Sequence, residues 1–211
     1  MAGTWDKQDK VIPGAYINLL TNTPLSISVG ERGTVLIAQE LSVGTDNDIY
    51  EIAASEGAYP ENASTADKKL AKLALMGAKT VLLYKLPTAH TDEHVETMLE
   101  ALKTVDFDVL VYPYAKSGTA ASAAQQKIAA WIKAMQDDEG KNVTAVLPNY
   151  PADTEYIINN TQGTVLSDGS SLTAYETAAW IGGITAGASI TKSNTAQKFE
   201  GAIDVVPRMT R

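Results

Sequence analysis

Residues 80–112 read TVLLYKLPTAHTDEHVETMLEALKTVDFDVLVY, which is the pattern of a strand, a helix and a second strand in succession. Thr80–Tyr84 is a short apolar run that is typical of a buried strand. Within Asp92–Leu102, apolar residues recur at i, i+3, i+4 and i+7 from Val95, which predicts a helix with one buried face. Phe107–Tyr112 (FDVLVY) then predicts another buried strand.

The same alternation extends to both sides of this segment. Further buried strands are predicted at Thr34–Ala38 and Asn142–Leu147. Further helices are predicted at Ala66–Met76, capped by Ser64 or Thr65, and at Ala120–Met135. Strand–helix–strand units that repeat about every 30 residues favour an α/β fold, a mostly parallel, doubly wound-like sheet flanked by helices.

The remaining segments are shorter and less regular. Gly44–Glu61 reads as a polar loop. Tyr156–Asn159 and Thr164–Leu166 read as a short strand and its neighbour, Leu172–Ala188 as the fourth helix, and Ala202–Val205 as a last short strand.

The first 30 residues are predicted to form an extended arm rather than a core element. Pro13-Gly14 and Asn22-Thr23-Pro24 interrupt its apolar residues, and only Tyr16–Leu20 is long enough for one extended segment. Such a segment needs a sheet edge to pair with, on its own domain or on a neighbour, and a frayed tail is the alternative. Residues 31–205 are then expected to form the core domain.

Composition excludes several classes of function. The 211 residues contain no cysteine, which removes disulfide frameworks and thiol chemistry. The 17 basic residues are outnumbered by 25 acidic ones, for a net charge of −8, which argues against nucleic acid as a partner. Residues 1–10 have no apolar core of a signal peptide, and Ala178–Ile190 is too short and too rich in glycine for membrane insertion.

Sequence motifs for catalysis or cofactor binding are weak. No phosphate-binding glycine pattern follows any predicted strand, and Lys116-Ser117-Gly118-Thr119 reads as an ordinary capped turn. His90 and His94 are four residues apart, but a solvated loop–helix junction is favoured over a metal site. Thr45–Asp48 reads as a polar loop and Asp137–Gly140 as a solvated helix end. We therefore predict no enzyme, no catalytic residue, no cofactor and no metal.

The glycines of the fourth helix suggest close packing. Gly182, Gly183 and Gly187 lie inside a helix, where each costs roughly 1 kcal/mol relative to alanine. Close approach of another backbone is the usual compensation, so this face is predicted to pack on the sheet or on a neighbour. Trp131 and Trp180 are expected in the core, whereas Trp5 in the arm is suited to docking on a partner.

Four segments together resemble the core of contractile tail sheath proteins, found in bacteriophage tails, defective prophages and R-type bacteriocins. They are Gly3–Leu19 (GTWDKQDKVIPGAYINL), Leu70–Tyr84 with Thr91–Pro113, Ala130–Leu147 (AWIKAMQDDEGKNVTAVL) and Ala178–Val205. The last contains the glycine-rich helix, Ser193-Asn194-Thr195 and the closing Gly-Ala-x-Asp-Val. Only about eight residues join the strand ending near Tyr84 to the next helix, as in the compact type of sheath.

The resemblance implies a structural, non-enzymatic subunit of the virion tail sheath, made and assembled in the bacterial cytoplasm. Such subunits polymerise around the tail tube and contract to drive it through a cell envelope, as in contractile injection systems. The implied partners are neighbouring sheath subunits and, through a C-terminal domain that follows in the family, the tail tube protein. Residues 206–211 (VPRMTR) resemble the start of the linker to that domain. The arm residues that the resemblance would lend to a neighbouring subunit are Trp5, Val11, Ile12, Tyr16 and Ile17.

Two alternatives remain open from the sequence. A flavodoxin-like small-ligand-binding domain or enzyme would carry a deep polar cleft near Lys85–His90 and Tyr114–Thr119, at the carboxyl ends of its strands. An accessory or adhesin-like protein would have no contractile role.

Overall fold

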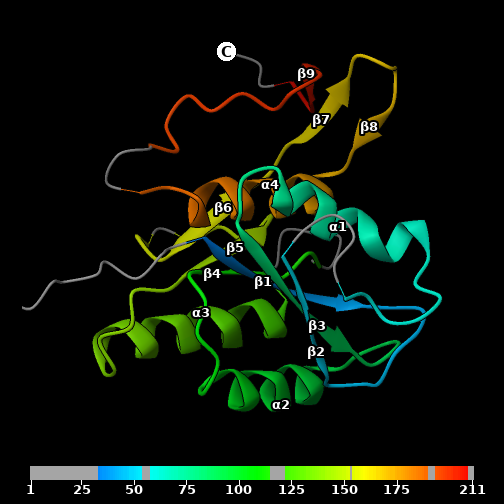
Figure 1. Ribbon diagram of the computed structural model, residues 1–211. Helices are drawn as coiled ribbons and strands as arrows, with labels where there is room; N and C mark the ends of the chain where they lie inside the picture. The colour runs from blue at the N-terminus through cyan, green and yellow to red at the C-terminus, as the bar shows by residue number, and fades with distance from the viewer. Residues whose placement is uncertain (1–32, 54–57, 115–121, 153, 190–192, 209–211) are drawn as a thin grey trace, which may run out of the picture. The chain divides into compact units, whose positions relative to one another are not determined.

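A six-stranded sheet is the centre of the computed structural model, with strand order β2-β3-β1-β4-β5-β6 (Figure 1). The strands are β1 (Thr34–Glu40), β2 (Ile49–Ile52), β3 (Thr80–Leu86), β4 (Val109–Val111), β5 (Thr144–Pro148) and β6 (Ile157–Asn160). All neighbouring pairs are parallel except β2 with β3, which is antiparallel. The predicted α/β fold with a mostly parallel sheet is therefore confirmed.

The structure describes residues 33–53, 58–114, 122–152, 154–189 and 193–208. They belong to the unit Arg32–Arg211, whereas the preceding unit, Met1–Glu31, lies outside the described residues. The arm residues Trp5, Val11, Ile12, Tyr16 and Ile17 and the turn at 116–119 are therefore not described.

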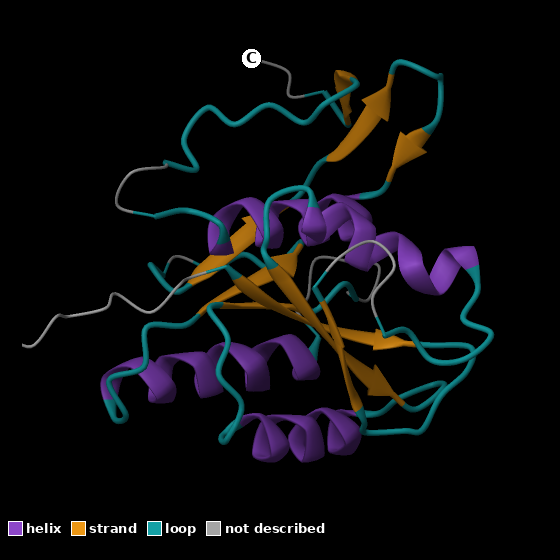
Figure 2. Ribbon diagram, viewed as in Figure 1, coloured by secondary structure: helices purple, strands orange, loops and turns teal. Residues whose placement is uncertain are grey.

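Helices cover both faces of the sheet (Figure 2). α1 (Thr65–Leu75) and α4 (Ala174–Ala186) lie on one face, and α2 (Asp92–Leu102) and α3 (Ala123–Asp137) on the other. Successive residues of a strand point to opposite faces, so Leu36 of β1 joins the core under α2 and α3 and Val35 joins the core under α1 and α4. Both faces of β1 are buried, which explains its continuous apolar run.

Capping hydrogen bonds at the N-termini of three helices explain where these helices begin. Ser64, Ser122 and Thr173 each accept a hydrogen bond from the backbone N–H three residues later. In each case the side chain of that third residue accepts a hydrogen bond from the cap's own backbone N–H, which completes a capping box. α3 thus begins at Ala123, and α4 begins at Ala174 rather than at the predicted Leu172.

A second, antiparallel sheet contains the strands β8 (Ser171–Leu172), β7 (Gly163–Leu166) and β9 (Ala202–Val206), in that order. The hypothesis that Tyr156–Asn159 and Thr164–Leu166 form neighbouring strands is therefore wrong, because β6 and β7 belong to different sheets. β7 instead pairs with β9, which lies almost 40 residues further along the chain and gives no local signal of the pairing.

The polar, loop-rich segment Gly44–Glu61 also contains a strand that its sequence does not predict. β2 lies within it and forms the edge of the central sheet. Tyr50 and Ile52 pack on the core under α1 and α4, but a strand of only four residues gives too few repeats of this alternation to stand out in the sequence.

Candidate functional site

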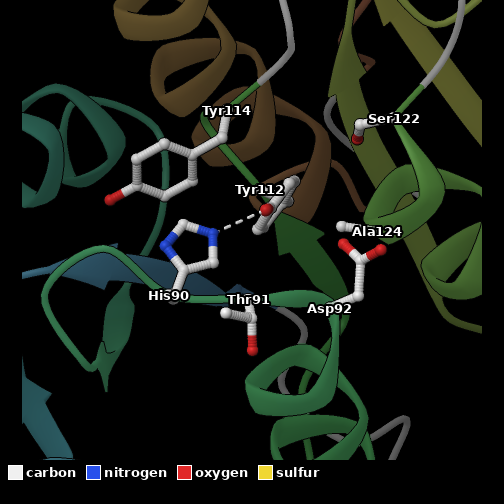
Figure 3. Close-up of a pocket in the computed structure, with 7 residues that line it drawn as sticks. All are labelled: His90, Thr91, Asp92, Tyr112, Tyr114, Ser122 and Ala124. Atoms are coloured by element: carbon white, nitrogen blue, oxygen red, sulfur yellow. Dashed lines mark hydrogen bonds between the residues drawn. The ribbon is translucent and has the colours of Figure 1, made fainter.

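The carboxyl edge of the sheet, where α/β folds bind ligands, holds His90, Tyr112 and Tyr114 (Figure 3). Glu40, which contacts His90, completes this cluster. His90 follows β3, Glu40 ends β1, and both tyrosines follow β4. The His90 Nδ1 atom lies 2.6 Å from Glu40 Oε1, and its Nε2 atom lies 2.7 Å from the Tyr112 hydroxyl. The Tyr114 hydroxyl accepts a 2.7 Å hydrogen bond from the Glu40 backbone N–H.

These contacts assign the protons of the cluster. The Glu40 carboxylate can only accept, so Nδ1 of His90 carries a proton, while Nε2 and the Tyr112 hydroxyl share the second hydrogen bond. Burial opposes the charge on Glu40, but the hydrogen bonds from His90 outweigh it and hold the pKa of this carboxyl below its usual range. Burial raises the pKa of Tyr114 to about 12 and raises that of Tyr112 as well. Both hydroxyls therefore stay protonated at neutral pH.

The hypothesis that His90 sits at a solvated junction is wrong. Its side chain is only 10% exposed and is held by partners on two other strand ends. Burial of a polar ring requires hydrogen-bond partners, and those partners are far from His90 in the sequence. His94 does lie at the helix start, where its Nδ1 accepts a hydrogen bond from the Thr91 backbone N–H. Within the described ranges, no group of three His, Asp or Glu residues is placed to hold a metal ion.

Beside the cluster lies a cavity of about 430 Å³, lined by His90, Thr91, Asp92, Tyr112, Tyr114, Ser122 and Ala124. Both ring nitrogens of His90 already have protein partners, and Ser122 caps α3. The ring of His90 and the hydroxyl of Ser122 are thus bonded to other protein groups rather than directed at an empty position in the cavity.

Removing the Tyr112 hydroxyl is expected to destabilise the fold while the aromatic ring keeps its packing contacts. Tyr112→Phe leaves the buried Nε2 atom of His90 without its hydrogen-bond partner, which costs about 1–2 kcal/mol. Urea unfolding measures this, with Tyr175→Phe on the half-buried side of α4 as the control, expected to change stability by less than about 0.5 kcal/mol. Equal stability of Tyr112→Phe and the unchanged protein would show that this hydrogen bond does not stabilise the fold.

Two further polar networks fill the same edge. The Asp67 carboxylate accepts hydrogen bonds from the backbone N–H and the hydroxyl of both Ser42 and Ser64, which ties the loop after β1 to the start of α1. Lys85, at the end of β3, is 5% exposed and pairs with Asp46. Thr45–Asp48 is thus not only a solvated polar loop, because Asp46 neutralises a buried cation.

The three glycines occupy close contacts inside the domain, although Gly187 caps the end of α4 and does not lie inside the helix as predicted. A Cβ atom on Gly183 would lie 2.1 Å from the Ala74 carbonyl oxygen of α1, and one on Gly187 would lie 2.0 Å from that of Gly77. A Cβ atom on Gly182 would lie 2.3 Å from a methyl group of Val111 on β4. The face of α4 that carries them therefore packs on α1 and on the sheet. Trp131 and Trp180 are half-buried rather than in the core, and contact Phe107 and Phe199 respectively.

β9 presents an apolar surface to solvent. Ile203, Val205 and Val206 are 68, 41 and 53% exposed, and the described residues place no strand beyond β9 in its sheet. An exposed apolar edge strand is a template for pairing with another segment. No helix in the described part of the chain is both long and apolar enough to cross a bilayer.

Comparison with known proteins gives a consistent result. Residues 88–211 match the family described as phage tail sheath protein central domain. The phage-like element PBSX protein XkdK of Bacillus subtilis is 39% identical over 111 residues, which are 53% of this chain and 23% of that protein. The chain matches 23–41% of the length of its curated relatives.

Solved structures share the fold. The sheath tail protein of Desulfitobacterium hafniense superposes with a TM-score of 0.75 at 25% identity, over 93% of this chain and 68% of that one. The helical sheath of the anti-feeding prophage in its contracted state has a similar fold, with a TM-score of 0.58 at 15% identity over 96% of this chain and 60% of that one. With a family match over more than half of its length, the chain belongs to the phage tail sheath protein family.

Proposed function

We propose that this chain is a structural subunit of a contractile tail sheath, which polymerises around a tail tube and contracts to drive the tube through a cell envelope. The match of residues 88–211 to the sheath family carries the proposal. Further support comes from the relative in a phage-like element and from the fold shared with a contracted helical sheath. We place the protein in the virion tail sheath, assembled in the bacterial cytoplasm.

The physical requirement of a contractile sheath is two stable packings of rigid subunits. A core with helices on both faces of the sheet, cross-linked at its carboxyl edge by hydrogen-bonded networks, suits a body that moves without deforming. A small free-energy difference between the two packings of each subunit adds over many subunits. Weak contacts between rigid subunits are therefore sufficient for a large free-energy difference between the two states of the whole sheath.

We propose that the connection between subunits runs through the arm at residues 1–30. Its apolar members Trp5, Val11, Ile12, Tyr16 and Ile17 are suited to strand addition on a neighbouring subunit. A tail tube protein is the second partner, reached through a C-terminal domain such as the sheath family carries after this region. We also propose that 206–211 leads into that domain.

Replacing the apolar arm residues tests the connection. In the full-length gene product, serine at Val11, Ile12, Tyr16 and Ile17 is expected to reduce polymers, counted by sedimentation and electron microscopy, at least about tenfold, since strand addition depends on buried apolar side chains. Serine at the polar residues Asp6, Asp9 and Lys10 is the matched control and leaves the yield unchanged. Normal polymers from the apolar variant would refute the role of the arm.

The flavodoxin-like alternative is not favoured. It requires polar groups at the carboxyl edge that are available to bind a ligand. His90, Glu40 and Asp67 at this edge instead form hydrogen bonds with other protein groups. We accordingly propose no catalytic role for the chain.

A further inference from the structure

The outer face of α1 combines positive charge with exposed apolar surface. The helix carries three lysines, Lys68, Lys69 and Lys72, and its single carboxylate, Asp67, is buried. A groove of about 390 Å³ runs along it, lined by Thr65, Ala66, Lys69, Lys72, Leu73 and Met76. Met76 is 48% exposed. This surface, defined by those six residues and called the α1 groove, offers an apolar floor between two ammonium groups. The Lys69 ammonium also pairs with Glu176 of α4 at 2.5 Å, but its side chain remains 44% exposed.

The outer face of α2 carries the opposite charge. Its sequence, DEHVETMLEAL, contains four carboxylates and neither lysine nor arginine. Glu93, Glu96 and Glu100 are exposed, so their carboxylates form an acidic stripe along the helix. Glu96 contacts Lys127 at 2.7 Å and Glu100 contacts Lys103 at 2.8 Å, but the side chains remain 59 and 72% exposed. Both carboxylates therefore remain accessible to another cation.

The two surfaces lie on opposite faces of one sheet, because α1 and α2 pack against different cores (Figure 1). Two different patches on opposite faces of a subunit join copies head to tail, and such a contact repeats to form a closed ring or a helical array. Lys69 and Lys72 are three residues apart, as are Glu93 and Glu96, so each pair presents its charges one helical turn apart. The spacing of the charges therefore matches.

We propose that the α1 groove of one copy binds the acidic stripe of α2 on the next copy, and that this contact joins neighbouring subunits of the sheath. This proposal rests on the proposed function and identifies two surfaces through which sheath subunits would join. The protein has a net charge of −8, so two copies repel unless opposite charges meet locally. The apolar floor at Leu73 and Met76 adds burial to the ion pairs, and the lysine stems extend that apolar surface.

Charge reversal with mixing tests the contact in the full-length gene product. Lys69→Glu/Lys72→Glu makes both surfaces acidic, and Glu93→Lys/Glu96→Lys makes both basic. Each variant alone is expected to form polymers at least about tenfold less well than the unchanged protein, since like charges oppose docking. In an equal mixture every contact between the two variants again joins opposite charges, so polymers return. Electron microscopy and sedimentation count them, and circular dichroism shows that each variant is folded.

Matched controls carry the same change of charge elsewhere. Asp138→Lys/Glu139→Lys, at the exposed end of α3, adds four charges as the α2 variant does and leaves assembly unchanged. Raising the salt concentration from 0.1 to 1 M shortens the Debye length from about 10 to about 3 Å and weakens assembly of the unchanged protein.

The outcomes separate the two proposals. Tubes from the unchanged protein and from each reversed variant alone overturn the α1–α2 contact and leave the proposed function standing. Loss of tubes in each variant without recovery in the mixture shows that α1 and α2 bind something other than each other, which also overturns the contact. Absence of tubes from the unchanged protein overturns the proposed function and the contact together.

Discussion

Gly183→Ala is expected to destabilise the domain by about 2–3 kcal/mol, although alanine is the better helix former by about 1 kcal/mol. The added Cβ atom would lie 2.1 Å from the carbonyl oxygen of Ala74. That oxygen belongs to the backbone of α1, so it cannot turn aside as the end of a side chain would. Relief therefore requires α1 and α4 to move apart, which loses packing along both helices.

Urea unfolding measures the change in the free energy of unfolding caused by Gly183→Ala. A decrease shows that the close contact dominates, and an increase shows that the helix propensity of alanine dominates. Thr185→Ala, at a half-buried position on the same helix, is the control and is expected to be neutral or slightly stabilising. A Gly183→Ala protein as stable as the original would mean that the close contact of α1 with α4 does not constrain the fold.

Asp67→Asn is expected to cost about 2 kcal/mol at pH 7 and much less near pH 2. Burial disfavours the charged carboxyl, but hydrogen bonds from Ser42 and Ser64 more than compensate and lower its pKa to about 2. Because the pKa in the folded state is below that of the unfolded chain, near 3.8, the unfolded state takes up the proton first. The stabilisation is therefore complete above about pH 4 and is lost as the pH falls from about 4 to about 2.

Unfolding free energies of the unchanged protein and Asp67→Asn, measured between pH 2 and 7, test this account. The difference between them should shrink as acid protonates the carboxyl. The matched variant Asp168→Asn, in an exposed turn, should track the unchanged protein more closely across the range. A difference for Asp67→Asn that stays constant with pH would show that the charge on Asp67 contributes nothing.

The sequence predicted the elements whose signals are local. β1, β3, β4 and β5 are buried on both faces and read as continuous apolar runs, and Ser64 marks a helix start by its own chemistry. β2 is not predicted because it is only four residues long, too short for the alternation of Tyr50 and Ile52 to mark a strand. The pairing of β7 with β9 is decided by tertiary packing, since nothing near either strand specifies a partner so distant in the chain.

The polar cluster at the carboxyl edge was only partly predictable. The topology of parallel strands placed His90 and Tyr114 at the same edge, as the flavodoxin-like alternative assumed. The hydrogen bonds that join Glu40, His90 and Tyr112 connect the ends of three strands, and no spacing in the sequence encodes them. The glycines in and next to α4 did give a usable signal. Glycine destabilises a helix relative to alanine, so its presence there indicates a position where another backbone packs closely. Only the structure identifies Ala74, Gly77 and Val111 as the partners.

Electron microscopy of the full-length gene product, purified without other tail proteins, tests most directly whether this chain is part of a sheath subunit. Striated tubes built of stacked rings are expected, because head-to-tail contacts that do not close on themselves repeat as an open helical array. A preparation that contains only dispersed, folded monomers at high protein concentration and low salt would contradict this expectation.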